Sequence, residues 1–139
     1  MNKNFQKKGF MVVEVLIAVS IITVSVLAAM AVAQKSVYVS RQAFHTTQAA
    51  FLLEGGAENA RIARDNAWSN VATINTSEQI GIFSQTVVAS DVTRDATTGD
   101  IGPGNPDSGT KLITVTVSWP EGGNTIVKTL QFYISDIFS

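Results

Sequence analysis

An uninterrupted apolar run near the N-terminus dominates the hydrophobic pattern of the chain. Residues 10–33 contain one charged side chain, Glu14, and they follow a polar segment, residues 1–9, that carries Lys3, Lys7 and Lys8. A helix over residues 10–33 would be about 36 Å long, which exceeds the roughly 30 Å of a bilayer's hydrocarbon core. The run therefore predicts a membrane-spanning helix. The lysines before it predict that the N-terminus stays in the cytoplasm and that the rest of the chain is exported.

Residues 34–68 remain helical in pattern but become amphipathic. Val37, Phe44 and Phe51 recur every seven residues, and the first proline of the chain is Pro103. Nothing therefore forces a break in one helix from Phe10 to about residue 65. Three further features are expected in its last part: close packing at Gly55 and Gly56, a solvated charged face that includes Glu58 and Arg61, and an end at Trp68, which would cap the core.

From residue 69 onward the period becomes that of extended strands. The sequence predicts strands over residues 79–90, 111–119 and 125–135, with residues 120–124 closing a hairpin and residues 91–109 forming a surface loop. Apolar and polar residues alternate most clearly over 111–119, which is typical of a strand with one buried face. The apolar face needs cover, and we expect a helix stripe to supply it: Phe44, Phe51, Leu52 and Ile62. The fold class expected is α+β, with a long N-terminal helix packed on a small antiparallel sheet of about three strands.

Composition and charge exclude several classes of function. The chain has 139 residues, 10 Lys plus Arg, 11 Asp plus Glu, one histidine and no cysteine. Without a basic surplus, specific nucleic-acid binding is not expected. Without cysteine there are no disulfides, thiolate zinc sites or cysteine nucleophiles. The one histidine, His45, has no carboxylate at helical spacing beside it. We therefore expect no catalytic residues, no enzyme activity and no cofactor.

The segment 91–109 is rich in aspartate, and this raises the question of a metal. Its spacing matches no EF-hand series, so we interpret the aspartates as turn-forming residues and expect no metal. Calcium bound by Asp91, Asp95 and Asp100 remains the alternative.

The order Lys7-Lys8-Gly9-Phe10, followed by Glu14 and an unbroken apolar run, resembles the processing site of type IV pilins and of the pseudopilins of type II secretion. This resemblance implies a class III signal peptide: a prepilin peptidase would cut between Gly9 and Phe10, and Phe10 would be N-methylated. Glu14 would then stand fifth in the mature chain. The resemblance also implies the lollipop shape of pilin-like proteins, although the helix-loosening proline of many major pilins is missing here.

Cleavage before Phe10 would also give Glu14 a partner. The new amine lies four residues away, and in staggered neighbouring helices the amine of one subunit can meet the carboxylate of the next. The family is thought to use its glutamate in this way, so the resemblance implies an assembly salt bridge at Glu14. The alternative is a glutamate tolerated at the membrane surface by snorkelling.

The resemblance implies a structural subunit of a filament. Four segments are then expected: a leader (1–9), the membrane and assembly half of the helix (10–33), its amphipathic half (34–68) and a β-sheet head (69–139). Partners would be other pilin subunits, the peptidase that also methylates Phe10, a pilus assembly platform and, before assembly, the cytoplasmic membrane. The final location would be an extracellular filament or a pseudopilus. Residues 49–68 are also similar to minor pilins of the PilV type, so a minor pilin is the favoured subclass.

Other classes stay open at this point. A major pilin and a type II secretion pseudopilin are the nearest. A membrane-anchored extracellular binding domain, a domain secreted by ordinary cleavage after Ala33, and a membrane-displayed hydrolase are the others, although no catalytic set supports the last.

Overall fold

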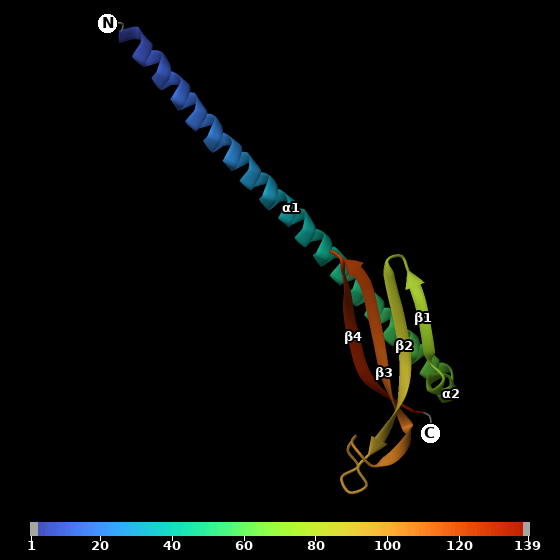
Figure 1. Cartoon of the computed structure of the whole chain (residues 1–139). Coiled ribbons are helices and arrows are strands. Elements are labelled where there is room, and N and C mark those ends of the chain that lie inside the picture. The colour runs from blue at the N-terminus through green and yellow to red at the C-terminus, as the bar shows by residue number, and fades with distance from the viewer. Residues whose placement is uncertain (1–2, 138–139) are drawn as a thin grey trace. The chain divides into compact units, whose positions relative to one another are not determined.

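The computed structural model describes the backbone of residues 3–137 and the side chains of residues 10–137. Two helices come first, α1 (Lys3–Asn66) and α2 (Trp68–Ala72), and four strands follow: β1 (Asn75–Ile80), β2 (Phe83–Arg94), β3 (Asn105–Glu121) and β4 (Asn124–Ser135). Figure 1 shows these elements along the chain. The chain divides into two compact units, residues 1–43 and residues 44–139.

The first unit is the N-terminal part of α1. From Phe10 to Ala43 every side chain is exposed, including the whole apolar run 10–33. The helical prediction for this segment is confirmed, because its strong helix formers meet no proline or glycine after residue 9.

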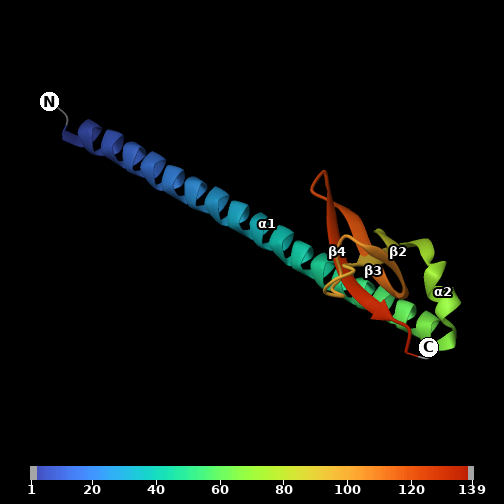
Figure 2. The same cartoon turned by 90° about the horizontal axis from the view of Figure 1, so that it is seen from below.

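The second unit is an α+β layer pair, as expected from the sequence. Its sheet is antiparallel in the order β1-β2-β3-β4, and residues 44–66 of α1 cover one face of it. Figure 2 shows the strands on one side of this part of the helix, with α2 beside its C-terminal end.

The sheet has four strands, one more than the sequence predicted. The segment 79–90 is not one strand, because Ile80 pairs with Phe83 across a two-residue turn formed by Gly81 and Ile82. Gly81 has a φ of 61°, a conformation that favours glycine and that tight hairpin turns require. The hairpin predicted at residues 120–124 is confirmed, with Gly122 and Gly123 as its two turn residues.

The loop predicted over residues 91–109 is also too long. Strand β2 continues to Arg94 and β3 begins at Asn105, with a register shift between Asp91 and Val92. Val92 is buried, and the Arg94 guanidinium contacts the Asp107 carboxylate at 2.5 Å, so both flanks of the segment belong to the sheet. The loop proper is residues 95–104.

The helix stripe that covers the sheet differs from the expected one. Phe44, Phe51 and Ile62 are exposed, and only Leu52 of the expected set packs against the core. The covering stripe consists of small residues and two leucines at helical spacing: Ala49, Leu52, Leu53, Gly56, Ala57, Ala60 and Ala63. Small side chains let the helix backbone approach the sheet closely, and this sets which face turns inward.

Gly56 marks the closest approach. A Cβ atom at this position would lie 2.7 Å from Cγ1 of Val115, whereas one at Gly55 would meet nothing within 4 Å. The expectation of close packing is therefore confirmed for Gly56 and wrong for Gly55.

Helix α1 ends at Asn66, two residues before the expected end, and Trp68 begins α2. Trp68 packs against the larger core cluster, and its Nε1 donates to the carbonyl oxygen of Ser108 at 2.9 Å. The core itself contains the inward residues of the strand segment 111–119, as the alternation predicted: Ile113, Val115, Val117 and Trp119.

The opposite side of the sheet, which we call the outer face, is open to solvent. Its central row crosses all four strands, and further rows flank it on both sides. The central row is Ser77, Thr86, Thr116 and Thr129. The flanking rows are Gln79, Ser84, Ser118 and Val127 on one side and Asn75, Val88, Thr114 and Gln131 on the other.

Candidate functional site

The predicted processing residues lie at the start of α1. The α1 backbone begins at Lys3, but the side chains of Lys3, Lys7 and Lys8, and Gly9 itself, lie outside the residues whose surroundings the structure describes. Phe10 is 82% exposed and Glu14 is exposed. Four residues apart on a helix, Phe10 and Glu14 occupy neighbouring positions on one face, with Cβ atoms about 5–6 Å apart. An amine at Phe10 would therefore start within one helical turn of the Glu14 carboxylate.

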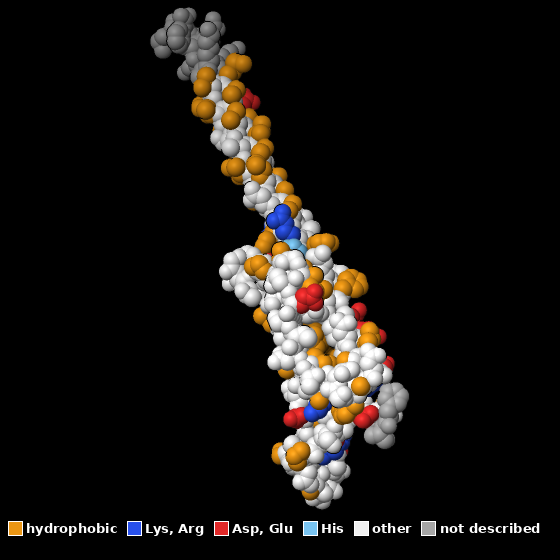
Figure 3. Space-filling model, turned by 90° about the vertical axis from the view of Figure 1, so that its right-hand side faces the viewer, with side chains coloured by type: hydrophobic (Ala, Val, Ile, Leu, Met, Phe, Trp, Pro, Cys, Tyr) orange, Lys and Arg blue, Asp and Glu red, His pale blue; other side chains and the backbone are white. Residues whose placement is uncertain are grey.

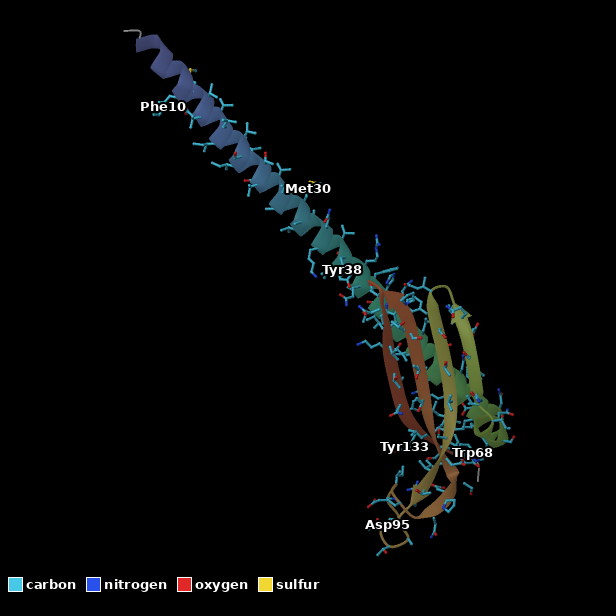
Figure 4. All side chains as sticks on the ribbon, viewed as in Figure 1. Phe10, Met30, Tyr38, Trp68, Asp95 and Tyr133 are labelled. Carbon is cyan, nitrogen blue, oxygen red and sulfur yellow. The ribbon has the colours of Figure 1, made fainter. Side chains whose placement is uncertain are left out.

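The apolar segment that follows is long and apolar enough to cross a membrane, and none of it is buried within the described structure. Figure 3 shows apolar side chains over this part of the molecule, and Figure 4 shows Phe10 and Met30 extending outward from the helix. A helix that is apolar all round requires lipid or other helices as its surroundings.

Hydroxyl groups within this segment are satisfied inside the helix. Each donates to the carbonyl oxygen four residues earlier, at 2.7 to 2.8 Å: Ser20, Thr23 and Ser25. A hydroxyl bonded in this way does not need water, which is the condition for placing it in hydrocarbon. The sequence alone could have indicated these bonds, because a hydroxyl within an apolar helix is a sign of such bonding.

Polar chemistry resumes directly after the segment. The Lys35 ammonium lies 5.2 Å from the centre of the Tyr38 ring, one turn further along the helix. A tyrosine and a lysine at the end of an apolar helix are typical of the boundary between hydrocarbon and water.

His45 does have a carboxylate partner, which the sequence analysis missed. One carboxylate oxygen of Glu121, the last residue of β3, lies 3.3 Å from the His45 Nδ1 atom, and the same oxygen accepts a hydrogen bond from Trp119 Nε1 at 2.8 Å. The two residues are 76 positions apart, so no local spacing could reveal the pair. The Glu121 side chain is 5% exposed, and this cluster ties α1 to the hairpin.

The aspartates of the loop and its flanks have separate partners. Asp91 pairs with Lys111, and Asp107 pairs with Arg94. The Asp95 carboxylate accepts hydrogen bonds from the backbone N–H groups of Thr97 and Thr98. Figure 4 shows Asp95 in the loop beyond the end of the sheet. In the described part of the chain, no three acidic or histidine side chains gather to hold a metal ion, so Asp91, Asp95 and Asp100 are not brought together.

Two of these carboxyl groups are held in their ionised form. Hydrogen bonds from the backbone N–H groups of Thr98 and Thr97 lower the pKa of Asp95. The hydrogen bond from Arg94 is the largest influence that lowers the pKa of Asp107. Arg94 also donates to the carbonyl oxygen of Gly99 at 2.9 Å, so it fixes the loop as well as its base. These contacts explain the aspartates as structural residues.

An open groove of about 550 Å³ lies between α1 and the β1–β2 turn. Phe51 and Ile82 line it and are 68% and 44% exposed, and the nearby Phe44 is 60% exposed. Phe51 and Ile82 thus give the groove an exposed apolar lining. Clustered exposure of this kind marks surfaces that become covered by a partner.

Comparison with known proteins adds no assignment: no protein-family model, no curated protein and no solved structure matches this chain. What the chain does must therefore be inferred from its own residues.

Proposed function

We propose that this chain is a structural subunit of a type IV pilus or a related pseudopilus, most similar to a minor pilin. It is made as a membrane precursor, cut between Gly9 and Phe10, methylated on Phe10 and then polymerised through the N-terminal part of α1. One observation carries the proposal: the apolar helical segment 10–33 contains a single charge, Glu14, placed one turn from the residue that follows a Lys-Lys-Gly sequence.

The Glu14 carboxylate carries a free-energy cost in an apolar environment. A lone carboxylate in an apolar helix is unfavourable, by up to about 2.5–3.5 kcal/mol at the centre of a membrane and by less near its surface, and a simple anchor gains nothing by keeping one. In a packed bundle of such helices, the Phe10 amine of one subunit pairs with Glu14 of another. A misaligned subunit leaves both charges without partners in an apolar environment, and this selects the correct axial register.

The exposure of the segment supports the same proposal. Lipid surrounds the apolar helix before assembly, and neighbouring helices replace lipid in the filament. The internally bonded hydroxyls of Ser20, Thr23 and Ser25 are compatible with both surroundings. The subunit lies in the cytoplasmic membrane with its N-terminus inside and its sheet-bearing unit outside, and then in the filament.

The minor-pilin subclass has narrower support, namely the similarity of residues 49–68 to minor pilins of the PilV type. A type II secretion pseudopilin shares every feature of the N-terminal segment, and a membrane-anchored binding domain shares the apolar helix but gives Glu14 no role. Only a minor pilin and a pseudopilin require cleavage before Phe10.

The test is the intact mass of the protein recovered from membranes of cells with and without an active prepilin peptidase. We expect a chain that begins at methylated Phe10 only when the peptidase is active. Gly9→Val should keep the leader attached. The matched control is Ala33→Leu, which blocks ordinary signal cleavage and should leave the mature N-terminus at Phe10. A chain that begins at Gln34, or an intact Met1 in every strain, would contradict the proposal.

A further inference from the structure

The outer face of the sheet is uncharged. None of the residues that form its three rows, from β1 to β4, is an Asp, Glu, Lys or Arg. Charged residues make up 15% of the chain, and none of them lies in these three rows across four strands. In Figure 1, residues 44–66 of α1 lie behind the sheet and this face is turned toward the viewer.

The charges of the edge strands are at inward positions instead. Glu78 pairs in register with the buried Gln85, and Lys128 pairs with the buried Val117, so both lie on the helix side of the sheet. Charge is therefore present on the partly covered side and absent from the open one. Inward charges on edge strands protect a sheet from pairing edge to edge, so Glu78 and Lys128 have a role that leaves the outer face neutral.

Hydroxyl and amide groups take the place of charge on this face. Within the rows, side chains of β3 and β4 contact each other: Thr116 Oγ1 lies 3.5 Å from Thr129 Oγ1, and Gln131 donates to Thr114 Oγ1 at 3.1 Å. A hydroxyl both donates and accepts, and an amide offers two donors and an acceptor, so the face can bond to groups of either kind. Because strands lie about 4.8 Å apart, the rows present these groups at fixed spacing.

Apolar side chains complete the surface. Val127 is 54% exposed and Tyr133, near the other end of β4, is 52% exposed; Figure 4 labels Tyr133. A tyrosine offers a rigid apolar ring with a polar tip, and it loses little conformational freedom on binding. The face thus combines neutral hydrogen-bonding rows with apolar contacts beside them.

Three classes of partner fit less well. Nucleic acids and acidic or basic peptides depend on charge that this face does not have. Packing of a second copy, sheet against sheet, would need a more apolar centre, because serine is depleted in protein interfaces and their cores are about 65% apolar. Sugar rings, in contrast, carry neutral hydroxyls around apolar C–H surfaces.

We propose that the outer face binds an uncharged polysaccharide, with the sugar hydroxyls bonded to the central row and the C–H surfaces of the rings against Tyr133 and Val127. This inference does not depend on the proposed role as a filament subunit, because every residue it uses lies in the sheet.

The test measures retention of the full chain, in detergent micelles, on insoluble cellulose and chitin, with heparin beads as a charged comparison. We expect retention on at least one of the two neutral polysaccharides and none on heparin at physiological salt. Thr129→Glu should reduce retention about tenfold or more, because it places an unpaired charge against neutral groups. Thr129→Ser should preserve retention.

The matched control is Thr76→Glu. Thr76 is also an exposed threonine on an edge strand, but it pairs with the buried Val87 and so lies on the opposite side of the sheet. It should leave retention unchanged, and both variants should unfold at the wild-type temperature. Absence of retention on both polysaccharides, or equal effects of the two glutamates, would overturn the inference. A third outcome would also overturn the inference: the wild type is a dimer that neither polysaccharide retains, and Thr129→Glu is a monomer. A second copy of the chain would then be the occupant of the outer face.

Discussion

Glu14 is the residue on which the proposed assembly depends most directly. It is exposed on a helix whose neighbouring side chains are apolar, and it lies one turn from the N-terminus that cleavage would create. Before assembly the carboxylate can reach water at the membrane surface by snorkelling. After assembly it is surrounded by other helices, so its partner decides whether the state is stable.

Replacing this carboxylate should separate insertion from assembly. We expect Glu14→Leu to be cleaved and inserted normally but to enter filaments at least about tenfold less than the wild type, because the register check is lost. The measurement is the ratio of filament-bound to membrane-bound protein in sheared fractions. Glu54→Leu, an exposed glutamate of α1 in the sheet-bearing unit, is the control and should assemble normally. Normal assembly of Glu14→Leu would refute the role given to this charge.

Two adjacent glycines make a second prediction at this scale. Gly56→Ala gains about 1 kcal/mol of helix propensity but drives a methyl group into the buried side chain of Val115, and overpacking costs about 1–3 kcal/mol. Its net effect should be a loss of stability. Gly55→Ala gains the propensity without a clash and should stabilise the protein by about 0.5–1 kcal/mol. Thermal unfolding of the two variants should therefore shift in opposite directions, and equal shifts would show that Gly56 is not in close contact.

Among the elements, α1 departs most from its sequence pattern. The seven-residue recurrence of Val37, Phe44 and Phe51 suggested a stripe that packs on the sheet, yet Phe44 and Phe51 are exposed. The sheet is covered by the alanine-rich face instead, because small residues permit the closer approach. Phe44 and Phe51 are then left exposed on this chain. In the proposed filament, a neighbouring subunit covers them.

This arrangement predicts that Phe51→Ser weakens assembly without unfolding the subunit. Because Phe51 is 68% exposed, the free energy of unfolding should change by about 0.5 kcal/mol or less. The amount of filament recovered from cells should fall several-fold. Ile62→Ser, a half-exposed apolar residue of the same helix that does not line the groove, is the control and should assemble like the wild type. A large loss of thermal stability in Phe51→Ser would mean that the ring supports the fold.

The strands were easier to predict than their boundaries. Strict alternation identified the core strand around Ile113 to Trp119, and two consecutive glycines identified the β3–β4 turn. The turn at Gly81 was missed because one glycine followed by an isoleucine is a weak turn pattern. The flanks of the loop were missed because Asp107 is paired by Arg94, a contact that only the paired strands create.

For the whole molecule, the main prediction is its orientation in the membrane. The chain has no cysteine, so single cysteines can be introduced without a background of native thiols. Thr97→Cys, in the exposed loop, should react with a membrane-impermeant maleimide added to intact cells. Asn4→Cys should react only after the membrane is permeabilised, because the proposed orientation keeps the lysine-rich leader in the cytoplasm. The comparison is made in cells without prepilin peptidase, so that the leader remains attached. The reverse labelling pattern would contradict an exported sheet.

Three features could be predicted from the sequence alone: the long helix, its apolar N-terminal segment with one carboxylate, and the α+β class of the rest. These features depend on period, length and local composition, which act between residues close in the chain. Tertiary packing sets which face of α1 meets the sheet, that His45 pairs with Glu121, and that Asp91 and Asp107 pair with Lys111 and Arg94. These outcomes depend on side chains from distant elements competing for the same space and the same hydrogen bonds, and no local pattern records that competition.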